Sequence, residues 1–96
     1  MSPPHMSGHE QKYLADVFAA NWIAPVGPQL TEFERRFAER VGVAGAVAVS
    51  SGTAALHLAI HKLHLPRGSE IICPTLTFCA SANPILYAGA GPVFLD

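Results

Sequence analysis

The sequence predicts an α/β domain in which helices alternate with the strands of a parallel sheet. In the second half of the chain, short apolar segments of strand length alternate with longer segments in which apolar residues recur at helical spacing. Only short connections separate these segments, as in right-handed βαβ units. The first half instead holds two amphipathic helical segments. The predicted order is therefore two helices followed by βαβαβ.

The composition excludes several classes of protein. Charged residues make up 14% of the 96 residues and hydrophobic residues 50%, and the net charge is −1. A charged share of about 25% is usual, so the chain is too apolar to be disordered. With a net charge of −1, the composition gives no excess of basic residues with which to bind nucleic acid or an anionic membrane. Without a long apolar stretch or an export signal, we expect a cytoplasmic protein that packs against a partner or belongs to something larger.

The first helix is predicted over residues 9–20, where apolar side chains recur on one face. Ser7 and Glu10 have the spacing of a capping box at its start. Residues 21–29 interrupt the periodicity with two prolines and a glycine, so this segment is predicted to be a loop.

A second helix is predicted over residues 31–41, with Thr31 as its cap and Gly42 ending it. Arg35, Arg36 and Arg40 alternate with glutamates along this segment. Such spacing gives ion pairs between residues three or four apart. We therefore expect these arginines to lie on a solvated face of the helix.

The second half contains three predicted strands and two predicted helices. Residues 46–49 are wholly apolar, with β-branched side chains at alternate positions, as in a strand that is buried on both faces. Proline within the last helix is expected to kink it or to start a new turn. In order, the elements are strand 46–49, helix 54–64, strand 70–73, loop 74–78, helix 79–87 with Pro84, and strand 92–96.

The turn between the first predicted strand and its helix has the features of an anion site. Free backbone N–H groups at the helix start, the helix dipole and the hydroxyls of Ser51 and Thr53 all favour a negative charge. Gly52 and Ala54 would let a phosphate approach the backbone closely. The alternative is that Ser51 only caps the helix and Gly52 only eases the turn. No Gly-Lys-Ser/Thr follows, so a nucleoside triphosphate is not implied.

Phe78 lies just past the second predicted strand, in the loop at its carboxyl end. In open α/β sheets, ligands bind outside the carboxyl ends of the strands. An aromatic face at that edge could stack on a planar ring beside the phosphate site. The alternative is an ordinary core phenylalanine.

Two further groups of side chains are interpreted as structural. His57, His61 and His64 form one stripe along a helix, but no acidic residue or further ligand accompanies them, so no metal site is predicted. Cys73 and Cys79 are expected to be reduced, buried and inert, because the chain has neither an export signal nor a metal-binding spacing.

Six segments, taken together, carry a resemblance to a known family. They are residues 2–8, 21–28, 33–34, 50–56, 75–78 and 91–96. These segments span essentially the whole chain, in order and with matching gaps. They resemble the start of the DegT/DnrJ/EryC1/StrS sugar aminotransferases. The resemblance is greatest to the enzymes that aminate C4 of a UDP-4-keto-6-deoxy-N-acetylglucosamine-type sugar on the way to bacillosamine and related surface glycans.

The resemblance implies part of the large domain of a fold-type I, pyridoxal phosphate-dependent transferase. Such enzymes are usually homodimers with active sites at the subunit interface, and they pass an amino group from glutamate through pyridoxamine phosphate to a keto sugar. The positions that hold the cofactor phosphate correspond to Gly52, Thr53 and Ala54. The aromatic residue that stacks on the pyridine ring of the cofactor corresponds to Phe78. The loop that lines the nucleotide-sugar pocket corresponds to Trp22, Ile23, Ala24 and Pro25.

The resemblance also implies what is missing. The lysine that forms the imine in this family lies far downstream, and neither Lys12 nor Lys62 occupies its position. We therefore expect a truncated, inactive amino-terminal part of such an enzyme. Residues 1–42 would form the helices and substrate-side loop, and residues 43–96 the first βαβαβ portion. Two alternatives stay open: a non-catalytic phosphate- or cofactor-binding module that pairs with another chain, and a small domain whose Ser-Gly-Thr turn is only structural.

Overall fold

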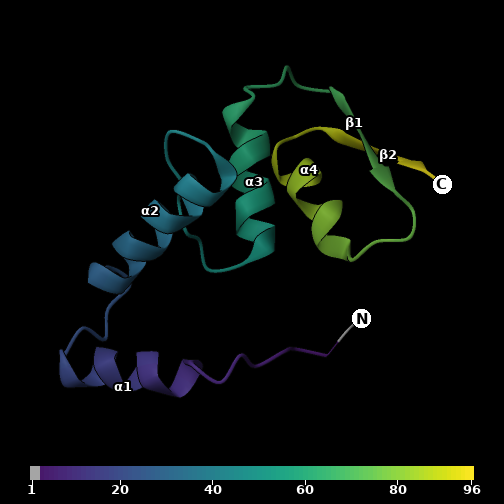
Figure 1. Cartoon of the computed structure of the whole chain (residues 1–96). Helices are drawn as coiled ribbons and strands as arrows, with labels where there is room; N and C mark the ends of the chain where they lie inside the picture. Colours follow the sequence, from purple (N-terminus) through teal and green to yellow (C-terminus); the bar gives the residue numbers. More distant parts are fainter. Residues whose placement is uncertain (1–2) are drawn as a thin grey trace. The chain divides into compact units, whose positions relative to one another are not determined.

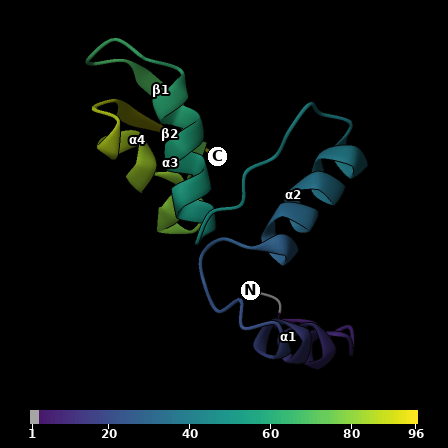
Figure 2. The same cartoon turned by 90° about the vertical axis from the view of Figure 1, so that its left-hand side faces the viewer.

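The computed structural model describes residues 3–96, so Ser2 of the matching segments lies outside the described residues. The chain forms two compact units, Met1–Ala48 and Val49–Asp96 (Figures 1 and 2). The first unit holds α1 (Glu10–Ala19) and α2 (Pro28–Val41). The second holds α3 (Gly52–Lys62), β1 (Glu70–Pro74), the short 3₁₀ helix η1 (Cys79–Ser81), α4 (Asn83–Tyr87) and β2 (Gly91–Leu95). The predicted α/β class is confirmed.

The second unit is organised around one parallel strand pair. β1 and β2 are in register from the pair Glu70–Gly91 to the pair Pro74–Leu95. Between them the chain crosses over through η1 and α4, and α4 begins at the proline-containing turn that the sequence predicts. Cys73, Ile85 and Ala90 form the buried core, with Ile60, Ile71 and Ala82 packed against it.

One predicted strand does not form. Residues 46–49 have no regular secondary structure, and Val47 is 72% exposed. A strand is stabilised by backbone hydrogen bonds to a neighbouring strand, and in the described part of the chain this segment pairs with none. The Ala48 N–H donates instead to the Glu34 carboxylate, at 2.8 Å. The sheet therefore has two strands where three were predicted.

The capping box before α1 forms only in part. The helix begins at Glu10 with His9 as its N-cap, not Ser7. The Glu10 carboxylate still reaches back and accepts hydrogen bonds from the Ser7 N–H (2.6 Å), the Ser7 hydroxyl (2.8 Å) and the Gly8 N–H (2.9 Å). These bonds lower the pKa of Glu10 to about 2, with the Ser7 N–H contributing most.

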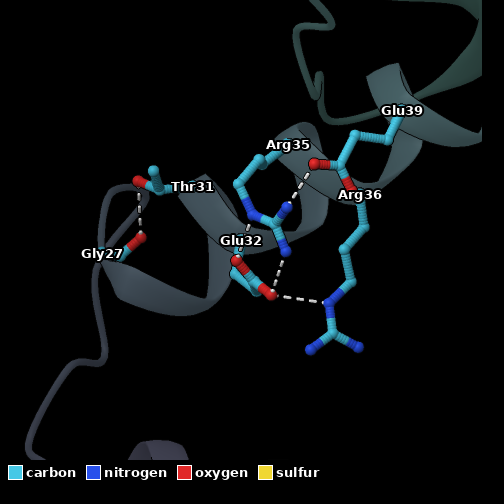
Figure 3. A network of polar contacts seen from close by, with 6 residues as sticks. All are labelled: Gly27, Thr31, Glu32, Arg35, Arg36 and Glu39. Carbon is cyan, nitrogen blue, oxygen red and sulfur yellow. Dashed lines mark hydrogen bonds and ion pairs between the residues drawn. The ribbon is translucent and has the colours of Figure 1, made fainter. Parts of the chain in front are cut away.

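α2 begins three residues earlier than predicted. Pro28 occupies its first turn, where a missing N–H costs nothing, and Gly27 precedes it. The Thr31 hydroxyl does not cap the helix but donates to the Gly27 carbonyl at 3.2 Å (Figure 3). The predicted end is confirmed, because Gly42 adopts a left-handed conformation with φ 76°.

The expected ion pairs form along the exposed face of α2. Glu32 pairs with Arg35 and Arg36, and Arg35 also pairs with Glu39 (Figure 3). The hydrogen bond from Arg35, followed by that from Arg36, lowers the pKa of Glu32 to about 2. Because all these side chains are exposed, the pairs keep this face solvated and add little to stability.

The depressed pKa of Glu10 predicts a local pH dependence. Its folded-state pKa lies below the usual 4.5, so the contribution of the carboxylate is present above about pH 4.5 and is lost as the pH falls towards about 2. An NMR titration of the Glu10 carboxyl carbon should give a midpoint well below 4.5. In Ser7→Ala the midpoint should rise only part of the way, because the Ser7 N–H bond remains. A wild-type midpoint at 4.5 would contradict these contacts.

The core of the second unit gives a stability prediction. Ile85 is 1% exposed, and truncating a buried isoleucine to alanine costs about 2–5 kcal/mol of unfolding free energy. We expect Ile85→Ala to lose this much in urea denaturation. Its neighbour Leu86, 57% exposed, is the matched control, and Leu86→Ala should change stability by about 0.5 kcal/mol or less. Equal losses in the two variants would contradict the assigned core.

Candidate phosphate and cofactor site

The start of α3 combines a helix cap with free hydrogen-bond donors. The Ser51 hydroxyl accepts a hydrogen bond from the Ala54 N–H at 3.2 Å, and the Ser51 carbonyl accepts one from the Ala55 N–H at 3.1 Å. Ser51 therefore caps the helix, as one interpretation of the sequence holds. The N–H groups of Gly52 and Thr53, however, find no acceptor among the described residues. Two backbone donors thus remain available to an anion.

The same end of α3 is sterically open. A methyl group placed on Gly52 would meet no atom of another residue within 4 Å, apart from its chain neighbours and the backbone of its own helix. Thr53, the second residue of α3, also carries a hydroxyl, which is a third potential donor in this turn. Open space, free N–H donors, a hydroxyl and the positive end of an eleven-residue helix together fit a phosphate group.

Phe78 is not a core residue. Phe78 is 66% exposed, and it immediately precedes η1 in the chain. η1 packs against α3, and both views show it beside the N-terminal end of that helix (Figures 1 and 2). Phe78 is thus an exposed residue directly before an element that packs against α3, and it is not buried among the described residues.

Trp22, Ile23, Ala24 and Pro25 lie in the loop between α1 and α2, in the other unit. The Trp22 N–H donates to the Val17 carbonyl at 3.1 Å. Its indole lies over Gly27, where an added Cβ would sit 3.4 Å from the ring. All four side chains are exposed, as a ligand-lining loop requires.

Within the second unit, Lys62 lies away from the Gly52 turn. Lys62 is the last residue of α3, whose eleven residues span about 15 Å along the axis. The second unit therefore places no lysine at the start of α3. Lys12 belongs to α1 in the first unit.

The remaining candidates from the sequence have structural surroundings. His57 packs edge-on against Tyr87, with ring centroids 5.4 Å apart. Within residues 3–96, no group of three or more acidic, histidine or cysteine side chains could hold a metal ion. Cys73 is buried as expected, whereas the expectation that Cys79 is buried is wrong, because Cys79 is the first residue of η1 and is exposed there. No helix among the described residues has the length and apolarity to cross a membrane.

Two side-chain contacts near Phe78 were not identified in the sequence. The Thr75 hydroxyl donates to the Asp96 carboxylate, and the hydroxyls of Thr77 and Ser81 lie 2.7 Å apart. The only available signal was that both residues lie near the carboxyl ends of predicted strands, Thr75 two residues after strand 70–73 and Asp96 at the end of strand 92–96. Their meeting depends on the strand register, which no local pattern gives.

Comparisons with known proteins find relatives that match the whole chain. EpsN of Bacillus subtilis (strain 168), named as a pyridoxal phosphate-dependent aminotransferase, is 56% identical over all 96 residues, which cover 25% of EpsN. The GDP-perosamine synthase of Caulobacter vibrioides is 42% identical over the same length, which covers 26% of that protein. The chain thus spans about a quarter of the length of these relatives.

Solved structures show the same relationship. Spr1654 of Streptococcus pneumoniae, described as a sugar aminotransferase, matches 99% of this chain over 24% of its own. The TM-score is 0.80 at 33% identity for its PLP form and 0.85 at 36% for its PMP form.

Pyridoxal phosphate is accordingly the cofactor of these proteins, and the present α/β unit has the fold of their amino-terminal part. The sequence pattern of the family extends over residues 4–96, essentially the whole described chain. The chain belongs to the DegT/DnrJ/EryC1/StrS aminotransferase family.

Proposed function

We propose that this chain is the amino-terminal part of a nucleotide-sugar aminotransferase. The reaction moves an amino group from glutamate to a UDP-4-keto-6-deoxy sugar during surface-glycan synthesis. One observation carries the proposal: the N–H groups of Gly52 and Thr53 are free at the start of α3, and η1, which the exposed Phe78 directly precedes, packs against that helix. A relative named for a GDP-sugar product supports a nucleotide-sugar substrate.

The residues at the start of α3 hold the phosphate of the cofactor in this proposal. The N–H groups of Gly52 and Thr53 donate to the phosphate oxygens, and the helix dipole favours the negative charge. Ser51 can take part without leaving its cap, because its oxygen accepts from the Ala54 N–H while its proton stays free to be donated. The Ala54 N–H, by contrast, is already engaged.

Phe78 supplies a flat apolar face for the pyridine ring in this arrangement. When bound, the cofactor acts as an electron sink, so that an amino group can be exchanged for a keto group. The contribution of this chain is binding and orientation. Lys62 lies at the opposite end of α3 from the turn, so in this proposal the amine that forms the imine comes from a downstream segment, as the family resemblance implies.

The first unit would contribute to sugar recognition. Trp22, Ile23, Ala24 and Pro25 are proposed to line the nucleotide-sugar pocket, since their side chains are exposed in one loop. We further propose a cytoplasmic homodimer. Many large apolar side chains are exposed in the described chain, among them Ile72, Phe94 and Leu95, as on surfaces that other protein covers.

A non-catalytic binding module is the second candidate. The observation that favours it is that Lys62 lies at the opposite end of α3 from the Gly52 turn. The start of α3 can therefore bind a phosphate but offers no amine of its own for catalysis. Sequencing the reading frame downstream of Asp96 distinguishes the two candidates. An aminotransferase requires a downstream lysine that forms the imine, whereas a binding module does not.

Thr53→Ala tests the phosphate site in the full-length protein. A hydrogen bond to a charged group contributes roughly 1.5–3 kcal/mol, so spectral titration should show cofactor affinity reduced by about tenfold or more. The unfolding free energy of the apoprotein should change far less. Ser69→Ala, which removes a hydroxyl bonded to the Pro66 carbonyl, is the matched control and should bind the cofactor normally. Unchanged affinity in Thr53→Ala would count against the site.

We expect a polypeptide of these 96 residues to have no aminotransferase turnover, because Lys62 lies at the opposite end of α3 from the Gly52 turn and the resemblance places the imine-forming lysine downstream. The assay uses mass-verified protein with glutamate, pyridoxal phosphate and a UDP-4-keto sugar. Amino-sugar formation that disappears in Lys12→Ala or Lys62→Ala would show that the imine-forming group has been misplaced.

A further inference from the structure

The loop that carries Phe78 is held by hydrogen bonds and not by packing. The loop covers residues 75–78 and all four of its residues are exposed, Leu76 at 98%. A ring that is itself 66% exposed has little van der Waals contact to fix its orientation. Its position must therefore come from the backbone, and the backbone from whatever anchors the two ends of the loop.

The first anchor is a cross-strand contact between Thr75 and Asp96. The Thr75 N–H donates to the Leu95 carbonyl at 3.1 Å, so the parallel ladder continues one residue beyond β1. Thr75 and Asp96 are then the next facing pair after Pro74–Leu95. The Thr75 hydroxyl donates to Oδ1 of Asp96. A hydrogen bond to a carboxylate is stronger than one between neutral groups, so this contact fixes the start of the loop.

The second anchor lies on the other side of Phe78. The hydroxyls of Thr77 and Ser81 are 2.7 Å apart, and the Ser81 N–H donates to the Phe78 carbonyl at 2.9 Å. The Thr77 N–H also turns back to the Thr75 carbonyl at 3.1 Å. Every contact on this side is local, within five residues. Among the described residues, only Thr75 ties the loop to a distant part of the sequence, through its N–H to the Leu95 carbonyl and through its hydroxyl to Asp96. The bond to Asp96 is the only one of these that depends on a side chain.

We propose that Asp96, acting through Thr75, is a positioning residue for the Phe78 ring. Its carboxylate holds the loop in place before the cofactor arrives, so that binding does not have to order an exposed segment at the same time. Such pre-organisation raises affinity by lowering the entropic cost of binding. This inference rests on the proposed function, because it takes Phe78 to be the residue that stacks on the cofactor.

The test uses the full-length protein with three variants at the anchor, Thr75→Val, Asp96→Ala and Asp96→Asn. Affinity for pyridoxal phosphate is measured by absorbance. The orientation of the cofactor's pyridine ring is measured by the circular dichroism that the protein induces in the bound cofactor. Inorganic phosphate, competing with the cofactor, reports the phosphate site alone. Ser69→Ala serves again as the remote hydroxyl control.

We expect Thr75→Val and Asp96→Ala to raise the dissociation constant of the cofactor about three- to tenfold and to reduce the induced signal. Inorganic phosphate should bind within about twofold of wild type, since the Gly52 turn is untouched. Asp96→Asn should be intermediate, because an amide oxygen still accepts the bond without a charge. The double variant should be little worse than either single variant, since both remove the same bond.

Phe78→Leu separates this inference from the function on which it rests. If Phe78→Leu weakens cofactor binding while Thr75→Val and Asp96→Ala do not, the positioning role is wrong and the proposed site stands. If Phe78→Leu has no effect, the stacking role and the positioning role both fail. A parallel loss of inorganic phosphate affinity in the anchor variants would also overturn the inference, because it would indicate general damage to the fold.

Discussion

β1 and β2 pair in parallel, and the packing of Ile85 against Cys73 and Ala90 holds the crossover between the two strands in place. A parallel pair cannot be joined by a tight turn, so a crossover element must return the chain to the starting edge. Here that element is short, consisting only of η1 and α4. Its packing against α3 determines where Phe78 lies relative to the Gly52 turn. The candidate site of the second unit thus depends on one small buried cluster.

The start of α3 has two roles that do not compete. A helix leaves its first N–H groups without partners, and a capping side chain satisfies at most one or two of them. Ser51 engages the Ala54 N–H and leaves those of Gly52 and Thr53 free. A cap and an anion site can therefore share the same four residues. The structural interpretation of this turn does not exclude the functional one.

The surface of the chain reflects its low charge. Apolar side chains such as Phe18, Ile72 and Phe94 are more than half exposed, and only Ala38, Cys73, Ile85 and Ala90 are buried hydrophobic residues in the described part of the chain. Burial of apolar area is the main term that stabilises a fold. The chain matches only about a quarter of the length of its relatives. The other three quarters of such a protein could cover these exposed apolar side chains.

The sequence by itself determined the features that depend on neighbours along the chain. Gly42 ends α2 because only a residue tolerant of positive φ suits that position. Ser51 begins α3 because its hydroxyl reaches an N–H three residues on. The paired strands and the turn at Pro84 follow from equally local patterns. The family, and with it the roles proposed for Gly52, Thr53, Ala54 and Phe78, came from resemblance and not from these patterns.

Only the tertiary structure decided the features that need a partner distant in sequence. Residues 46–49 have the composition of a strand, yet a strand forms only where another strand offers its backbone groups. Cys79 is exposed although free cysteines are usually buried, so its exposure depends on the fold around it and not on its residue type. Thr75 and Asp96 are 21 positions apart, and the strand register alone brings them together. Register is set by the summed packing of two whole strands, so a pattern within either one cannot reveal it.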